Sequence, residues 1–323
     1  MPNIFTVERN ITKRKYIIDG FLASKTMNNI ISQAGVGKTR LAFQMAVDVA
    51  TGNDFLGMKV KQSKVLIVDN DQSEDESNEM LTLCLNYYGL KSCDNLLTSF
   101  QEDSYGIKND SLINLINSTD AELILLDSLT AFAHGLDMSK ARDMQGIKKL
   151  YTECIGKGKT IVWLHHISEH KQGDFMVCDP SDLCLYSSVI NGTMDGYFIL
   201  HNPNKGIDIK KLVIRPVVKR YKISSGTIET SQVETKDNYH FDSAVSIEQS
   251  EIVSEDEQDI MLVFVESQKP RSVNQVYGDL EGKHGICKVR ELLHKLEKQG
   301  KIRVIKHKSN LFKYELIKEK EGN

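Results

Sequence analysis

The sequence lacks the features that would place it among membrane, secreted or metal-stapled proteins. No apolar run approaches the ~18 residues of a membrane-spanning helix, and residues 1–10 carry no apolar signal-peptide core. The six cysteines are scattered without C-x-x-C spacing, which predicts reduced thiols rather than disulfides or a zinc site. These absences favour a cytoplasmic protein with no membrane partner.

The chain also lacks a strong charge of one sign. The formal net charge is −3 over 323 residues, so any surface that binds nucleic acid has to be local. The hydrophobic content of 40% and the charged content of 26% are ordinary for globular proteins. This length suffices for two domains, one of them large.

The clearest motif is Ile30-Ile31-Ser32-Gln33-Ala34-Gly35-Val36-Gly37-Lys38-Thr39. An apolar run, a small-residue loop and an amphipathic segment follow one another, which predicts the strand, loop and helix of a Walker A phosphate-binding loop. Glycines allow backbone N–H groups to turn toward phosphate oxygens, and the helix N-terminus adds its positive dipole end. The predicted nucleotide-binding residues are Ala34, Gly35, Val36, Gly37, Lys38, Thr39 and Arg40.

Two side chains of this loop have predicted chemical roles. Lys38 is expected to reach the β- and γ-phosphates, and the Thr39 hydroxyl is expected to hold Mg²⁺. Ser32 stands where the motif usually has its first glycine, and its small side chain is tolerated there. The sequence therefore predicts that the chain binds a nucleoside triphosphate, ATP, together with Mg²⁺.

Further apolar runs predict a buried, mostly parallel sheet. They comprise residues 65–68, 123–126 and 160–164 and alternate with helical patterns near 74–87, 111–117 and 139–155. Ser73 and Glu76 fit a capping box at the start of the first of these helices. Asp127 ends the second run, which makes it the predicted Walker B carboxylate and Mg²⁺ partner. The fold class is therefore α/β.

Later segments change in character. Residues 196–201, 210–218, 221–223 and 227–230 are strand-like and predict an antiparallel extension of the sheet. Residues 231–258 are acidic and poor in aromatics, which predicts a linker. The expected domains are an ATPase domain over residues 1–230 and a second domain over residues 259–323.

The C-terminal segment has the opposite charge. Residues 267–323 carry 14 Lys/Arg against 7 Asp/Glu, a net charge of +7. Three helical patterns and two strand patterns in this order resemble a winged helix-turn-helix domain, whose third helix enters the DNA major groove. Its basic residues could instead form a solvated face of a protein-interaction module. The candidate DNA-binding residues are His284, Lys288, Arg290, His294, Lys295 and Lys308.

The ordered set of motifs resembles the RecA-like ATPases, in particular the plasmid RepA-type and bacterial DnaB-type hexameric helicases. The resemblance covers about residues 28–223. It rests on the Walker motifs and on three further segments, which are His165-His166, the run from Tyr186 to Ile190 followed by Met194-Asp195-Gly196, and Val217-Val218-Lys219-Arg220.

The resemblance implies roles for several residues. Asp71 stands where this family usually has a glutamate as general base, with Asp69 and Glu74 as alternatives. His166, or His165, would sense the γ-phosphate, and Gly173–Leu185 would contact single-stranded DNA. Lys219 and Arg220 would act on a neighbouring subunit's nucleotide, with Arg215 as an alternative. These trans-acting residues imply a homo-oligomeric ring, for which a hexamer is the form found in the helicases that the sequence resembles.

The expected function is an ATP-driven, helicase-like DNA motor of a replication system that works with other replication proteins. No separate primase-binding domain is recognised before the phosphate-binding loop, so a compact RepA-like form is expected. The alternative is an ATP-switched DNA-binding regulator or helicase loader that does not unwind DNA. A recombinase-like filament former is a third possibility.

Overall fold

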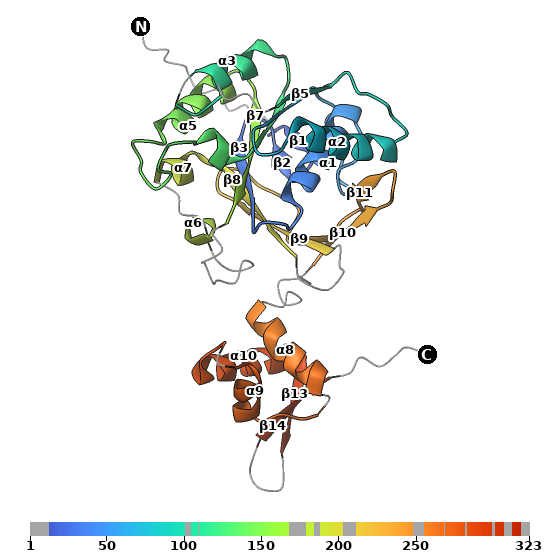
Figure 1. Cartoon of the computed structure of the whole chain (residues 1–323), viewed down its shortest axis with the longest axis vertical. Helices are drawn as coiled ribbons and strands as arrows, with labels where there is room; N and C mark the ends of the chain where they lie inside the picture. Colours follow the sequence, from blue (N-terminus) through green and yellow to red (C-terminus); the bar gives the residue numbers. More distant parts are fainter. Residues whose placement is uncertain are drawn as a thin grey trace.

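The computed structural model describes residues 13–100, 105–108, 110–167, 179–183, 188–202, 211–247, 255–267, 269–281, 283–298, 301–306 and 312–317. A ten-stranded sheet forms the larger part (Figure 1), in the order β11-β10-β9-β8-β3-β7-β6-β4-β5, with β12 paired to β10. Its strands are β3 (Met27–Ser32), β4 (Val65–Asp69), β5 (Leu96–Phe100), β6 (Leu123–Asp127), β7 (Thr160–His166), β8 (Gly196–His201), β9 (Lys211–Val218), β10 (Ile228–Glu234), β11 (Tyr239–Phe241) and β12 (Val245–Ser246).

The sheet is parallel from β8 through β5 and antiparallel beyond β8. This confirms the expected α/β fold with a mostly parallel sheet. Every residue of β3, β4 and β6 is buried, as continuous apolar runs predict for strands covered on both faces. The segment 221–223, expected to be a strand, lies outside the strands.

Helices cover both faces of the sheet. One face packs against α1 (Lys38–Thr51) and α2 (Glu74–Tyr87), the other against α3 (Ser111–Ser118), α5 (Gln145–Leu150) and α7 (Ser188–Thr193) (Figure 1). The hairpin of β1 (Tyr16–Ile18) and β2 (Leu22–Ala23) precedes the sheet. Two short helices, α4 (Leu129–Phe132) and α6 (Pro180–Leu183), follow β6 and β7.

Local sequence signals fix several helix ends. Ser73 and Glu76 form the expected capping box of α2, and α1 stops at Gly52, whose φ of 84° suits glycine. The helix expected over residues 139–155 starts later, at Gln145, and its last five residues form a π-helix, η1 (Tyr151–Ile155). Its expected first turn is a loop because the Asp137 carboxylate accepts bonds from the Ser139 N–H and hydroxyl, which compete with helix formation.

The expectation of a linker from residue 231 is wrong for its first half. β10, β11 and β12 place residues up to Ser246 in the main sheet. Beyond residue 230 these strands were not predicted because the segment is acidic. Alternate residues are nevertheless buried, as expected for strands: Ile228, Thr230, Tyr239 and Phe241. α8 (Glu255–Ser267) likewise begins within the expected linker.

The C-terminal part has its own small core. It contains α8, α9 (Val273–Asp279), α10 (Ile286–Lys298) and an antiparallel ribbon of β13 (Ile302–Lys306) and β14 (Phe312–Leu316). The buried residues of α10 repeat at three- and four-residue spacing and pack against Ile260 and Phe264 of α8. Ser272 caps α9 through a second capping box, as its sequence suggests.

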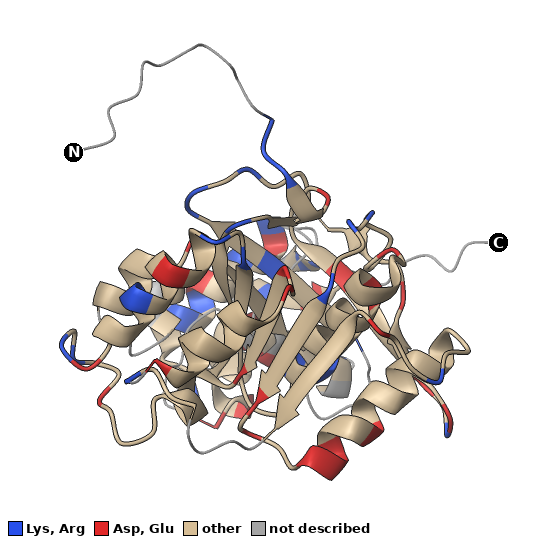
Figure 2. Ribbon diagram, turned by 90° about the horizontal axis from the view of Figure 1, so that it is seen from above, with Lys and Arg blue, Asp and Glu red and all other residues tan. Residues whose placement is uncertain are grey.

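In strands β3 to β8 of the larger part, Asp, Glu, Lys and Arg occur only at strand ends (Figure 2). Acidic residues stand at the tips of central strands, where Asp69 and Asp127 end β4 and β6. The four cysteines among the described residues are all free thiols. None of the helices in the described ranges is long and apolar enough to cross a membrane.

Candidate nucleotide site

The strand order brings the sequence motifs together at one end of the sheet. β7 lies between β3, which leads into the phosphate-binding loop, and β6, which ends in Asp127. Ser32 at the end of β3 is paired in register with His166 at the end of β7. Because the carboxyl ends of parallel strands share one edge, the loop, both histidines and the acidic residues of β4 and β6 converge there.

Lys38 occupies the centre of this cluster. It is only 4% exposed, and burial lowers the pKa of its ammonium group while the carboxylates of Asp127, Asp71 and Asp69 oppose that shift. Its Nζ lies 3.5 Å from Nε2 of His166. The carboxylates favour the charged form of Lys38 despite its burial, and a buried ammonium group is suited to bind a negatively charged phosphate.

Thr39 and Asp127 form the group that could hold Mg²⁺. The Thr39 hydroxyl donates to Oδ2 of Asp127 over 2.7 Å. The other carboxylate oxygen, Oδ1, is buried and has no hydrogen-bond partner among the described residues. Burial raises the pKa of Asp127 to about 6. A hydroxyl beside an unsatisfied carboxylate oxygen fits Mg²⁺, which binds through few protein oxygens and keeps several waters.

The aspartate that ends β4 and the one that follows two residues later have different environments. Asp69 is buried and accepts bonds from the backbone N–H groups of Asp71 and Gln72 and from the Ser77 hydroxyl. It therefore shapes the loop, and Asp71 is left facing the pocket. Glu74, the other alternative, lies exposed in the first turn of α2.

Asp71 is placed to act on a phosphate bound at Lys38. Its Oδ2 lies 3.6 Å from Nε2 of His166. A hydrogen bond from His166 is the largest cause of a lowered Asp71 pKa, which partial burial opposes. Asp71 is therefore ionised at neutral pH.

The two histidines are not equivalent. His165 is 6% exposed, its pKa is lowered to about 3 by burial, and its Nδ1 contacts the Thr130 hydroxyl at 3.3 Å. It is a neutral core residue. The half-exposed His166 instead contacts Lys38 and Asp71, so it is the member of the pair that borders the site.

The pocket has a second wall that the sequence did not indicate. It has a volume of about 520 Å³ and extends from the phosphate-binding loop to Leu212, Gln232 and Phe241 of the antiparallel strands. Arg40, a predicted nucleotide-binding residue, pairs with Glu234 of β10 at 2.8 Å. The residues of this wall are nearly 200 positions from the loop, and only the buried alternation of β10 and β11 could have signalled them.

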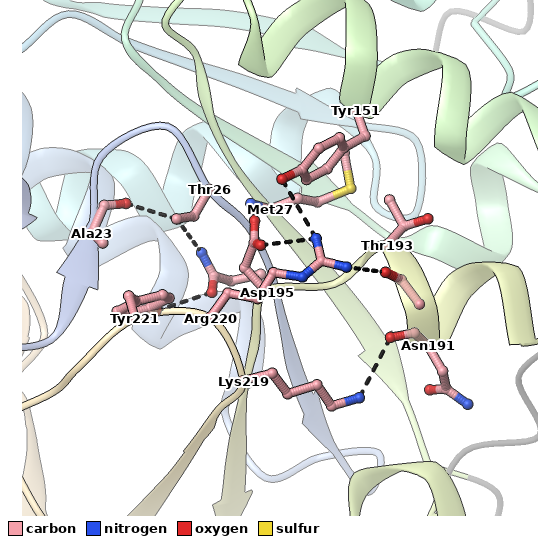
Figure 3. A network of polar contacts seen from close by, with 12 residues as sticks. Ala23, Thr26, Met27, Tyr151, Asn191, Thr193, Asp195, Lys219, Arg220 and Tyr221 are labelled. Carbon is pink, nitrogen blue, oxygen red and sulfur yellow. Dashed lines mark hydrogen bonds and ion pairs between the residues drawn. The ribbon is translucent and has the colours of Figure 1, made fainter. Parts of the chain in front are cut away.

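Lys219 and Arg220 lie at the opposite end of the sheet. β9 runs antiparallel to β8, so its end is level with the start of β3. Arg220 bonds to the carboxylate of Asp195 at 3.1 Å and to the carbonyl of Gly192, and its guanidinium lies beside Tyr151 (Figure 3). The other Asp195 oxygen accepts the Met27 N–H.

Lys219 is less constrained than Arg220. Its Nζ lies 3.4 Å from the carbonyl of Asn191 (Figure 3). It also lies 4.9 Å from the ring centre of Tyr197. Arg215 lies within β9, opposite Ile199 of β8. None of the three cations lines the pocket around this chain's own phosphate-binding loop.

Three of the DNA-binding candidates in the C-terminal part lie beside carboxylates of α8. Lys295 pairs at 3.1 Å with Glu257, which is fully buried, and His284 lies 3.0 Å from Asp259. Lys288 lies 3.8 Å from Asp256. These three candidates face the acidic first turns of α8, because α10 packs against α8 along one side.

Lys288 and Lys295 are nevertheless exposed, as are two further candidates on α10. Arg290 is exposed, and His294 is exposed with a Glu297 contact at 3.4 Å. Lys308 lies outside the described residues, as do most of the expected DNA-contacting loop Gly173–Leu185 and the run 184–187.

Comparisons with known proteins agree with this arrangement at the level of family. Residues 5–172 match the family described as "AAA domain". Among solved structures, a KaiC-like protein from the hyperthermophilic archaeon Pyrococcus horikoshii is similar at 16% identity and a TM-score of 0.48, covering 73% of this chain and 99% of that one. No curated protein matches the chain.

Proposed function

The chain belongs to the AAA domain family and has the RecA-like core of a P-loop ATPase, and from this premise we propose that it is an ATP-hydrolysing DNA-binding protein. Its role in this proposal is that of a helicase-like motor of a replication system, assembled as a homo-oligomeric ring in the cytoplasm with other replication proteins. Lys38, Thr39 and Asp71 converge on one pocket, and Asp127 accepts the Thr39 hydroxyl beside it; this arrangement carries the hydrolytic part of the proposal.

In this proposal, the residues divide the hydrolysis of ATP among them. Backbone N–H groups of the loop and Lys38 bind the β- and γ-phosphates, and Lys38 neutralises charge that develops in the transition state. Thr39 and Asp127 would hold Mg²⁺, which supplies charge neutralisation between the two phosphates. Asp71, whose pKa His166 lowers further, orients the attacking water by accepting its hydrogen bond.

His166 is suited to sense the γ-phosphate. Its Nε2 faces a donor, Lys38, at 3.5 Å and an acceptor, Asp71, at 3.6 Å, and one nitrogen cannot satisfy both at once. A γ-phosphate that recruits the Lys38 ammonium would free Nε2–H to donate to Asp71. ATP binding would thereby fix the tautomer of His166 and the position of Asp71.

The C-terminal part supports DNA contact. Three helices and a two-stranded ribbon, in that order, are typical of a winged helix-turn-helix domain. α8 is acidic, and residues 267–323, which begin at its last residue, carry a net charge of +7. Arg290 and His294 on the exposed side of α10 are the best candidates for contacting phosphates or bases.

Ring assembly would give Lys219 a target. Arg220 would have to leave the buried Asp195 carboxylate to reach another subunit, whereas Lys219 makes only a carbonyl contact and a ring contact. We therefore assign Lys219 as the stronger candidate for a cation acting in trans.

ATPase rates test the proposal. We would measure turnover by the full chain alone, with single-stranded DNA and with duplex DNA, using Lys38→Ala as the control. Strong stimulation by single strands, absent in the variant, supports a motor. No Mg²⁺-dependent hydrolysis under any of these conditions would overturn the enzymatic proposal.

A second candidate is an ATP-switched DNA-binding regulator or helicase loader. The ion pairs that occupy one side of α10 favour it, since they leave a small basic surface suited to a short duplex site. Slow turnover indifferent to single strands, together with nucleotide-dependent binding to duplex DNA, would select this function over the motor.

A further inference from the structure

The nucleotide pocket has a reactive side and a side that the chemistry of hydrolysis does not use. On the reactive side stand Lys38, Asp71 and His166, at the ends of the loop, β4 and β7. On the other side stand Leu212 of β9, Gln232 of β10 and Phe241 of β11. In the sheet order, β9, β10 and β11 lie on the opposite side of β3 from β7, β6 and β4.

This order fixes the direction in which a bound nucleotide runs. The γ-phosphate must lie near Lys38, the Thr39–Asp127 pair and Asp71, which are on the β7 side of the loop. The α-phosphate follows toward the first turn of α1, where Thr39 and Arg40 offer backbone N–H groups. Continuing along the same line, the nucleoside enters the part of the pocket enclosed by β9, β10 and β11.

We propose that the β9–β11 wall is the nucleoside-binding subsite, with Phe241 and Leu212 as its apolar seat and the side-chain amides of Gln232 and Asn202 at its polar edge. The proposal rests on the ATP binding proposed above. The tip of the Phe241 ring lies about 4.0 Å from where a Cβ on Gly37 would stand, so the ring abuts the phosphate-binding loop itself. An aromatic ring and an aliphatic side chain next to amide groups match the flat apolar faces and polar edges of a nucleobase.

Hydrogen bonds and an ion pair join this wall to α1, the helix that begins at the phosphate-binding loop. Gln44 of α1 accepts the backbone N–H of Phe241 and donates to its carbonyl at 3.2 Å. Arg40, in the first turn of α1, pairs with Glu234 and lies 5.2 Å from the ring centre of Tyr239. Gln232 also donates to Glu234 at 2.9 Å.

The same wall contacts α2. His240 stacks on Tyr87 with ring centres 3.7 Å apart and planes at 20°. Asn86 donates to the carbonyl of Asp237 in the β10–β11 turn. Because contacts with both α1 and α2 hold this wall in place, the subsite is formed before the ligand binds, which lowers the entropic cost of binding.

The test compares ATP with inorganic tripolyphosphate, which has the phosphates and no nucleoside. Dissociation constants of both would be measured by calorimetry on the full chain and on Phe241→Ala, Phe241→Leu and Gln232→Ala. Lys236→Ala, in the exposed turn of the same hairpin, is the matched control. We expect Phe241→Ala to weaken ATP roughly tenfold or more, by loss of base–aromatic contact, and to leave tripolyphosphate unchanged.

Gln232→Ala addresses the case in which the loss of the Phe241 ring disturbs folding. Gln232 is partly exposed, and its replacement should weaken ATP severalfold at constant tripolyphosphate affinity. Unchanged tripolyphosphate binding in each variant reports that the loop is intact.

Three results would overturn the proposal. Equal weakening of both ligands would mean that Phe241 only supports the loop. Unchanged ATP affinity in Phe241→Leu, Phe241→Ala and Gln232→Ala alike would place the nucleoside elsewhere. Wild-type affinity equal for ATP and tripolyphosphate would show that no nucleoside subsite exists, although the phosphate site does. If the wild-type chain bound neither ligand, the proposed ATPase function itself would fail.

Discussion

The two ends of the parallel sheet both bury charged side chains, but they leave them in different states. At the carboxyl end, Lys38 is buried among three carboxylates, and one oxygen of Asp127 has no partner among the described residues. At the opposite end, both oxygens of the buried Asp195 are used, one by the Met27 N–H and one by Arg220.

The difference separates charges kept for a ligand from charges that hold the fold together. An unsatisfied buried polar group costs free energy, so it persists where a bound phosphate or metal ion completes it. A satisfied pair such as Arg220–Asp195 instead fixes the start of β3 to the chain that follows β9. The same residue types therefore line the proposed ATP site at one end and stabilise the fold at the other.

Replacing Lys38 should have the largest effect on activity. In Lys38→Met, kcat for ATP hydrolysis should fall roughly 10³-fold, because the variant loses a positioned transition-state cation. The melting temperature should change by only a few degrees, since methionine preserves the volume and avoids burying a charge. Steady-state kinetics and thermal unfolding on one preparation check both expectations. If Lys38→Met instead lowered the melting temperature strongly while the folded variant kept its turnover, Lys38 would be a stabilising residue rather than a catalytic one.

Replacing Arg220 should have the opposite profile. Arg220→Ala leaves the Asp195 carboxylate buried without its cation, at a cost of about 2–3 kcal/mol of unfolding free energy. This cost is smaller than that of breaking a fully buried ion pair, because the Arg220 side chain is 45% exposed. Urea unfolding measures it, and Asp195→Asn combined with Arg220→Ala should recover part of the loss. Full stability with a hundredfold lower kcat would instead make Arg220 a trans-acting catalytic residue.

The pH dependence of hydrolysis should report on Asp127. Its pKa is raised to about 6, so activity should fall about tenfold per unit as the pH drops below that value and the protonated carboxyl loses Mg²⁺. Higher Mg²⁺ concentrations should move the midpoint to lower pH, because the ion favours the ionised form. A midpoint that Mg²⁺ does not move would point to another group.

The same shift affects stability in the metal-free protein. A folded-state pKa above the unfolded value means that the folded chain binds more protons between about pH 4 and 6, so unfolding free energy falls as the pH rises through this window. Thr39→Ala, which removes the hydroxyl that donates to Asp127, should steepen this decline.

The smallest effects are expected in the C-terminal part, where α10 shows the same contrast. Arg290→Ala should weaken DNA binding a few-fold, without loss of stability. It should also lower the slope of log binding constant against log salt concentration by about one. Lys295→Ala should instead destabilise this part, since it removes a cation beside the buried Glu257. Fluorescence anisotropy with labelled DNA and thermal unfolding separate the two. Equal DNA losses in both variants would contradict the assignment of Lys295 to an ion pair within the chain.

The sequence was informative where the relevant contacts are local. The phosphate-binding loop, the capping boxes at Ser73 and Ser272, and Asp127 at a strand end all depend on neighbours within a few residues. The convergence of Lys38 with Asp127 followed from the topology of parallel strands. The separation of Asp69 from Asp71 did not, because it depends on which carboxylate the Ser77 hydroxyl reaches.

Sequence reasoning failed where long-range pairs decide the structure. The acidic composition of residues 231–246 concealed strands whose partners are β9 and α1. The partner of Arg220 is Asp195, and that of Lys295 is Glu257, and neither pairing has a local signature. These two basic residues, predicted to act on ligands, also pair with carboxylates of their own chain.

The pairing of Gln44 with Phe241 has a consequence for biosynthesis. Gln44 is synthesised among the first fifty residues, but its backbone partner is 197 residues further along. During translation the phosphate-binding helix exists without one side of its pocket until Phe241 has left the ribosome. The nucleotide pocket is therefore one of the last parts of this domain to be completed, and a chain truncated before Phe241 would keep every Walker residue but lack an enclosed site.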